Sequence, residues 1–540
     1  MKPMCSVRSF VGLAFAAATP FACSQATQVT LDLATPPIAR AISPAIYGVN
    51  FASQAQAAEL NCVVNRNGGN SATRYNWQQN CTSSAQDWYF LSHSEDGTGP
   101  SGSIDGVVQA NKNAGVQSMV TVPILGYVAK LGPNGEWLWS FSVAKYGAQQ
   151  AVEPWHADAG NGVWTNGNNV TGNNPNDANM PVTIEYQRDW LNHLIGKFGK
   201  SNAGGVSYYL LDNEPGLWHE THRDVLPVGA KMQELFNREY RAAIMIKSLD
   251  PTAKVVGPEA WGWLEYLYSG YDFQWLGQHN WQQPSPDRAA HGNMDQAAWL
   301  LQQFRQVSIN VGKRLLDVFS VHYYPQGNYG DGDVSTAAQL WRNRSTRSLW
   351  DPAYTDESWI GAKINLIPRL RGWVNAYFPG TQIGITEYEF GAEDHISGAI
   401  AQADALGIYG REGVDLATRW VCPATGSRTY NAMKLYRNYD GLKSAFGRYS
   451  VALTTPNPDN FSAFGSYDTP GGPYKVMLIN KSLTQSQPVR LRPAGATSPR
   501  ATRYQLTQAN TITKLADVVG SGGQVDLSLP AQSITLVIVK

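Results

Sequence analysis

The chain has 540 residues, which is too long for one ordinary domain and suits a large domain joined to a smaller one. Lys and Arg together count 42, as do Asp and Glu, so the formal net charge is zero and neither a basic nucleic-acid surface nor an acidic tail is indicated. The 18 Trp and 26 Tyr either pack in a large core or provide flat platforms for sugar faces, and composition leaves both open.

The N-terminus has the pattern of an export signal. Lys2 and Arg8 precede an apolar run over residues 10–22, and small residues lead up to Ala26. This predicts a signal peptide over residues 1–26 and a secreted protein. A lipoprotein acylated at Cys23 is the less favoured alternative, because bulky residues precede that cysteine. No later stretch reaches ~18 apolar residues, so no transmembrane helix and no membrane partner is expected.

Three of the five cysteines follow the signal segment. Cys62 and Cys81 would close a short loop, and an exported chain can oxidise them, so we expect a disulfide between them. Cys422 would then be a lone buried thiol. The spacing fits no zinc pattern.

Short apolar runs alternate with helical stretches from residue 45 to about 440. Many of the runs are continuously apolar, as in parallel strands that are buried on both faces. Eight strands separated by helices predict an α/β fold, a (β/α)8 barrel with long insertions. The expected strands are 45–51, 63–66, 117–123, 206–213, 254–258, 316–323, 382–388 and 414–420. Helices are expected at 104–114, 181–198, 231–249, 294–311 and 397–409.

The longest insertion, over about residues 126–177, contains four tryptophans and ends in a Gly/Asn-rich run. Such a segment is not a regular strand or helix. It is either a floppy excursion or a loop that shapes a binding groove, and the tryptophans favour the groove.

The helical pattern fades after residue 440. Short alternating runs separated by turn sequences such as PNPDN and GSGG predict a smaller β-sandwich over residues 441–540. A further strand at 28–33, within the segment 27–44, precedes the barrel, and we expect it to join the sandwich.

Active sites of such barrels lie at the carboxyl ends of the strands. In YYLLDNEPGLW an apolar run stops at Asn213 and Glu214, and Pro215 ends the strand. We therefore expect Glu214 to be catalytic, although a carboxylate here could also cap the next helix. Asn213 could hydrogen-bond a sugar hydroxyl beside the scissile bond.

A second carboxylate is expected at the end of the seventh strand. GITEYEFG offers Glu387 and Glu389 on one strand face. Glu387 follows the apolar run directly and is preferred. The separation of the two carboxyl groups distinguishes retention from inversion, and sequence does not show it.

Other strand ends carry side chains that suit a sugar site. Arg66 could pair with the nucleophile, or could form a structural ion pair. Tyr324 could donate a hydrogen bond to the nucleophile, and either it or His322 could instead be core. Glu259 is a rival carboxylate of low weight. The remaining candidates are Asn70 and the aromatic platforms Trp420, Trp261 and Trp263.

Together these segments resemble glycoside hydrolase family 44, the endoglucanases and xyloglucanases. The resemblance rests on NRNGGNSATRYNW, LLDNEPGLWHETHRDV, DVFSVHYYPQ and ITEYEFG, in order across the barrel region. It implies a barrel with a sandwich built from both termini, and retention with Glu214 as acid/base and Glu387 as nucleophile. The implied substrates are soluble cellulose derivatives, mixed-linkage glucan and xyloglucan.

The resemblance implies no catalytic cofactor. Some family members carry calcium, for which Glu59 and Asp158 are the candidate ligands here. We expect a monomer whose partner is a β-glucan polysaccharide, with no nucleic acid. The alternatives are a barrel that binds glycans without cleaving them, and a hydrolase specific for mannan or xylan.

Overall fold

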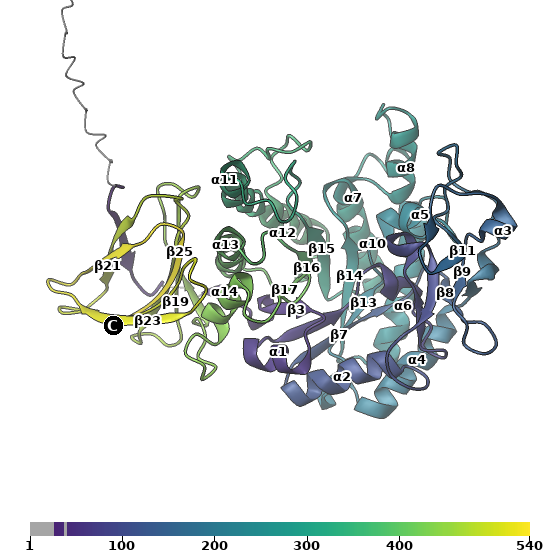
Figure 1. The fold of residues 1–540 in the computed structure, drawn as a ribbon. Helices are drawn as coiled ribbons and strands as arrows, with labels where there is room; N and C mark the ends of the chain where they lie inside the picture. Colours follow the sequence, from purple (N-terminus) through teal and green to yellow (C-terminus); the bar gives the residue numbers. More distant parts are fainter. Residues whose placement is uncertain (1–25, 37–39) are drawn as a thin grey trace, which may run out of the picture.

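The computed structural model describes residues 26–36 and 40–540. Eight parallel strands close into a barrel, in the order β13-β14-β15-β16-β17-β3-β4-β7, which confirms the predicted (β/α)8 fold (Figure 1). All eight expected strand positions are confirmed. The strands are β3 (Gly48–Asn50), β4 (Val64–Asn67), β7 (Gln117–Val122), β13 (Tyr208–Leu211), β14 (Lys254–Ala260), β15 (Val318–Tyr323), β16 (Gln382–Tyr388) and β17 (Leu416–Arg419).

The apolar character of the strands follows from burial on both faces. Met119, Leu210 and Val256 pack with one another in a cluster formed mainly by barrel strands. Their neighbours Val120 and Val255 belong instead to the large core that includes the helices. Each strand is followed by a helix. The eight helices are α1 (Gln54–Leu60), α2 (Gly102–Ala114), α4 (Ile184–Phe198), α6 (Met232–Leu249), α10 (Gln296–Asn310), α12 (Leu366–Tyr377), α13 (Ile396–Glu412) and α14 (Arg428–Arg437).

The insertion after β7 contains short regular elements, so the expectation that it lacks strands is wrong. Its strand β8 (Tyr127–Ala129) pairs with β12 (Asn179–Pro181), and β10 (Val152–Glu153) pairs with β11 (His156–Gly160). A third sheet joins β9 (Leu138–Trp139) to β6 (Leu91–Ser94), which pairs with β5 (Cys81–Ser83). These strands are too short to leave a periodic pattern in the sequence.

Two sheets form the predicted sandwich at the other end of the molecule (Figure 1). The predicted N-terminal strand β1 lies parallel to β21, so residues from both ends of the chain share this unit. The three-stranded sheet is β1 (Val29–Leu33), β21 (Gln487–Pro493) and β24 (Val525–Leu529). The seven-stranded sheet is β2 (Arg40–Ala41), β18 (Tyr449–Val451), β19 (Phe461–Tyr467), β20 (Tyr474–Asn480), β25 (Ser533–Val539), β22 (Arg500–Leu506) and β23 (Thr513–Val519).

Helix α13 joins the barrel to the sandwich. Nearly all its residues are buried, because one side packs in the barrel and the other contacts β19, β20 and β25. Phe464, Met477 and Leu536 of the seven-stranded sheet therefore belong to the same core as the barrel helices.

The predicted Cys62–Cys81 disulfide is wrong: Cys62, Cys81 and Cys422 are free, buried thiols. Cys62 follows α1, where its backbone N–H bonds Ala57, whereas Cys81 begins β5 and pairs with Asn76. Closeness in sequence thus does not bring the two thiols together.

The expected signal peptide, including Cys23, lies outside the described residues except for Ala26. Within the described part of the chain, no helix has the length and apolarity needed to cross a membrane.

Candidate active site

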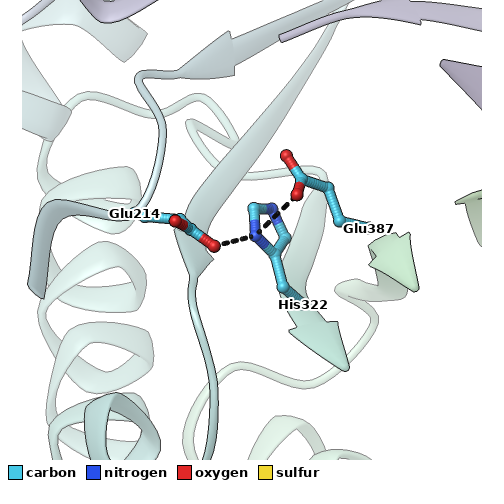
Figure 2. A group of neighbouring side chains, drawn as sticks. All are labelled: Glu214, His322 and Glu387. Atoms are coloured by element: carbon cyan, nitrogen blue, oxygen red, sulfur yellow. Dashed lines mark hydrogen bonds and ion pairs between the residues drawn. The ribbon is translucent and has the colours of Figure 1, made fainter. Parts of the chain in front are cut away.

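Glu214, His322 and Glu387 meet at the carboxyl ends of β13, β15 and β16 (Figure 2). One carboxylate oxygen from each glutamate and a ring nitrogen of His322 all lie within 4.8 Å of one another. The imidazole lies between the two carboxyl groups. The structure therefore brings together the two carboxylates chosen from distant parts of the sequence.

Glu214 is held in a left-handed backbone conformation (φ 44°) immediately before Pro215, which starts a short 3-10 turn. Its backbone N–H bonds the Glu259 carbonyl at 3.1 Å. Burial raises the pKa of its carboxyl group above the usual value; the hydrogen bond from His322 opposes this shift, and the charge of Glu387 adds to it. This environment favours a carboxyl group that keeps its proton.

Glu387 has the opposite kind of environment. Arg66 Nη1 lies 2.7 Å from its Oε1, and the Tyr324 hydroxyl donates to its Oε2 at 2.7 Å. Two donors, one of them cationic, favour the ionised carboxylate. Glu389, the alternative from the same motif, faces Arg419 at 3.7 Å instead.

His322 is fully buried and bridges the acids. Its Nδ1 lies 2.7 Å from Glu214 Oε1, and its Nε2 lies 3.3 Å from Glu259 Oε2. Burial alone would lower the pKa of the imidazole, but the charge of Glu387 and the hydrogen bonds to Glu214 and Glu259 raise it to about 10. The raised pKa favours the imidazolium, which can donate from both ring nitrogens.

Glu259 lies beneath the site and is fully buried. Burial would raise its pKa, but the charge of Arg66 and the hydrogen bond from His322 hold it below the usual value. Arg66 and His322 are then balanced by Glu259 and Glu387, so the cluster is neutral when Glu214 is protonated. Sequence reasoning gave Glu259 a low weight as a catalytic rival, and its observed role is that of a buried counterion.

Asn213 and Asn70 lie beside the acids. Asn213 Oδ1 accepts from Arg66 Nη2 at 2.9 Å and from the Gly69 N–H at 3.2 Å. Its amide nitrogen is therefore directed elsewhere, and lies 3.5 Å from Asn70 Oδ1. Asn70 in turn donates to both oxygens of Asp87.

The predicted aromatic platforms fall into two places. Trp420 follows β17, and its ring lies against Gly69, where a Cβ would overlap it, and edge-on to Phe51 at 5.4 Å. Trp261 and Trp263 line a pocket together with His322 and Tyr324. The same pocket contains Trp359, 59% exposed, which sequence reasoning missed because it lies in a loop with no strand pattern.

Glu265 is a second missed residue. It is buried in α7 (Trp263–Leu267), and its two oxygens accept the N–H groups of Gly216 and Trp261 at 2.7 and 2.8 Å. Burial raises its pKa to about 8, although the two backbone N–H groups oppose the shift. Glu265 ties the turn after Glu214 to the end of β14, and no local pattern in WLEYL predicts this.

Both calcium candidates have hydrogen-bond partners within the protein. Glu59 is occupied by Lys434 at 2.6 Å and by the Tyr430 hydroxyl, and Asp158 accepts from Trp139, Ser142 and the Ala144 N–H. They share no partner. Among the described residues, the one group of acids and histidines close enough to share an ion is Glu214, His322 and Glu387.

Known proteins resemble the chain along most of its length. The model of glycoside hydrolase family 44 matches residues 81–327. An endoglucanase A of Paenibacillus lautus is 33% identical over 85% of this chain and 64% of that protein. A beta-mannanase/endoglucanase A of Caldicellulosiruptor saccharolyticus is 31% identical over 83% of this chain and 34% of that protein. The chain thus spans just under two thirds, and about one third, of these relatives.

Solved structures agree over nearly the whole fold. A bifunctional glucanase-xylanase protein from a metagenome library is 51% identical with a TM-score of 0.92, covering 95% of this chain and 99% of that one. A family 44 xyloglucanase of Paenibacillus polymyxa, solved with xyloglucan, is 27% identical with a TM-score of 0.77, covering 95% and 100%. With the family motifs in the order expected and the two carboxyl groups facing each other, the chain belongs to glycoside hydrolase family 44.

Proposed function

We propose that the protein is an endo-acting β-1,4-glucanase that hydrolyses its substrate with retention of anomeric configuration. The observation that carries this proposal is the facing pair of carboxyl groups, Glu214 and Glu387, with oxygens within 4.8 Å at the mouth of the barrel. Retaining glycosidases have carboxyl groups roughly 5–5.5 Å apart, whereas inverting ones leave about 6.5–9.5 Å for a water molecule. The short separation supports retention.

In the first step Glu387 attacks the anomeric carbon and Glu214 gives its proton to the glycosidic oxygen. The carbon–oxygen bond breaks, the leaving chain departs as an alcohol, and a glycosyl ester forms on Glu387. In the second step Glu214, now a carboxylate, takes a proton from water while the water oxygen attacks the same carbon. This step releases the sugar and restores both side chains.

The surroundings assign the two roles. His322 donates to Oε1 of Glu214, so the proton of Glu214 is left on Oε2, free to reach the substrate. Arg66 and Tyr324 each donate to one oxygen of Glu387 and fix the carboxylate in one orientation. Asn213, fixed through its oxygen, donates one amide N–H to Asn70 and has the other for a sugar hydroxyl beside the scissile bond. This chemistry needs no metal or redox cofactor.

The relatives support a glucan substrate, since their names record endoglucanase, glucanase-xylanase and xyloglucanase activities. We therefore propose carboxymethyl cellulose, mixed-linkage glucan and xyloglucan as substrates, acted on by an exported monomer. Mannan and xylan are the next candidate substrates, because one relative is named a beta-mannanase/endoglucanase and another a glucanase-xylanase.

A reducing-sugar assay on all five polysaccharides tests this proposal. We expect release from the three glucans, and loss of at least a thousandfold in rate for Glu214→Gln and for Glu387→Gln, as in removal of a group central to the transition state. NMR of fresh product should show the β-anomer first. An α-anomer would exclude retention, and wild-type rates in either variant would exclude the site. Binding of glucan without any hydrolysis would favour the non-catalytic alternative.

A further inference from the structure

Two exposed tryptophans lie close together outside the catalytic cluster. Trp155 is 78% exposed and Trp88 is 43% exposed. Their ring centroids are 6.3 Å apart and the ring planes differ by 30°, so the rings are stacked. We call this pair the indole shelf. Trp139 and Trp164, in the insertion after β7, have a different role. Both are half-buried, and their indole N–H groups donate to the Asp158 carboxylate and the Tyr146 carbonyl.

A single buried carboxylate holds the shelf in place. Glu153 is 2% exposed, and its Oε1 accepts from Trp88 Nε1 at 3.2 Å. Its Oε2 accepts the backbone N–H groups of Trp155 and His156, and lies 2.9 Å from His156 Nδ1. The Trp88 ring and the Trp155 backbone are therefore held before any ligand arrives, and the Trp155 ring stacks on Trp88, which lowers the entropy lost on binding.

Hydrogen bonds connect the residue before Trp88 to the catalytic site. Trp88 ends the 3-10 turn Ala85–Trp88, and the preceding residue Asp87 accepts both hydrogen bonds from Asn70. Asn70 contacts Asn213, which precedes the acid/base Glu214. The side chains of Asp87, Asn70 and Asn213 thus link the residue before Trp88 to the residue before Glu214.

The exposed indole faces indicate which kind of ligand the shelf binds. Wide exposure of a large apolar ring is unfavourable, and rigid exposed indoles occur where a ligand covers them. The C–H faces of β-1,4-linked glucose units are flat and apolar while their hydroxyl groups point outward at the edges, so they match an indole in a polar surround. Glu153 itself offers no charge to an ionic ligand, because it is buried and already bonded.

We propose that the indole shelf binds a glucosyl unit of the β-1,4-glucan chain at a position remote from the cleaved bond. The inference rests on the proposed function and adds to it a preference for long chains. Substrates too short to span from Glu214 to Trp155 do not benefit from the shelf.

Substrate length is the decisive variable. For Trp155→Ala we expect KM on carboxymethyl cellulose to rise about three- to tenfold, as for loss of one aromatic contact, with kcat nearly unchanged. Kinetics on an aryl cellobioside should match the wild type. Trp155→Tyr keeps a stacking ring and should recover most of the loss. Leu442→Ala, at an 82% exposed apolar residue elsewhere, is the matched surface control.

Affinity electrophoresis through gels that contain the polysaccharide measures the shelf without hydrolysis. In a Glu214→Gln background, Trp155→Ala should be retarded less than its parent. The proposal is overturned if Trp155→Ala and its parent are retarded equally, or if Trp155→Ala changes KM equally on long and short substrates. If the wild type cleaves no glucan, the proposed function fails instead, and this is a separate result from the same set of measurements.

Discussion

Glu214 and Glu387 carry the same functional group, and their neighbours make them different. Burial with one shared hydrogen bond favours the neutral acid at Glu214, while a guanidinium and a phenol favour the anion at Glu387. His322 connects the two, because its imidazolium contacts both acids and Glu259 below them. The charge of any one of these side chains therefore alters the pKa of its neighbours.

The raised pKa of Glu214 predicts the pH dependence of the reaction. The first step needs Glu214 protonated, so kcat/KM should fall as pH rises through its pKa, and the raised value moves that fall above the ~4.3 of a free glutamate. For Glu214→Gln we use an aryl glycoside whose leaving group departs without protonation. Its kcat/KM should not fall as pH rises through the pKa of the missing carboxyl group. A pH–rate profile that kept the wild-type alkaline limb in this variant would contradict the assignment.

Tyr324→Phe should slow the reaction while keeping the fold. The change removes the 2.7 Å hydrogen bond to Glu387 and leaves the ring in place. A hydrogen bond to a charged group contributes about 1.5–3 kcal/mol, so we expect kcat to fall about ten- to a hundredfold. Tyr323→Phe is the matched control, because its hydroxyl donates to the Ser345 carbonyl. Equal kcat losses in both variants would show a general packing effect.

Strand ends bring together the candidate residues that the sequence places there. Glu214, Glu387, Arg66 and Tyr324 all follow apolar runs that close the barrel, so topology alone brings them together. Glu265 and Trp359 were missed because one lies in a short helix and the other in a loop. The Cys62–Cys81 pairing failed for a related reason, since sequence separation does not report the direction of a side chain.

The position of a strand could be predicted from the sequence only where its hydrophobic pattern is clear. All eight barrel strands were found, because many of them lie in apolar runs bounded by turns. Strands β19 and β23 have weaker patterns: β19 (FSAFGSY) has glycine and serine inside it, and the edge strand β23 (TKLADVV) mixes charge with apolar residues. The two-residue strands of the insertion depend on tertiary contacts, which no short window of sequence contains.

Helix α13 offers a test of its position between barrel and sandwich. A Cβ on Gly407 would overlap the Phe464 ring of β19. Gly407→Ala should therefore lower the free energy of unfolding by about 1–3 kcal/mol, as overpacking does. Gly196→Ala in α4 is the control: its site is open, so the better helix propensity of alanine should stabilise by up to ~1 kcal/mol. Denaturant unfolding of both variants measures this, and a stabilised Gly407→Ala would refute the contact.

At the scale of the whole molecule, the sandwich and the barrel share one core and one buried ion pair. Lys481 of the sandwich lies 2.6 Å from Asp404 of α13, and both side chains are almost completely buried. Thr346 of the barrel donates to the same carboxylate oxygen. The pair therefore joins the two units at a place that water does not reach.

Removing one partner of this pair should weaken the attachment strongly. Lys481→Met leaves the Asp404 charge buried with only the Thr346 hydroxyl as a donor, and such a change costs about 3–5 kcal/mol. Arg492→Ala at the exposed, 3.9 Å contact with Asp32 should cost less than about 1 kcal/mol. Replacing both partners, as Lys481→Met with Asp404→Leu, should recover much of the loss because no charge then stays unpaired. Urea unfolding followed by fluorescence and by circular dichroism distinguishes the outcomes. A shared core predicts coincident transitions in the wild type and an earlier, separating one in Lys481→Met, whereas an unchanged midpoint would mean that the apolar contacts of α13 alone hold the two units together.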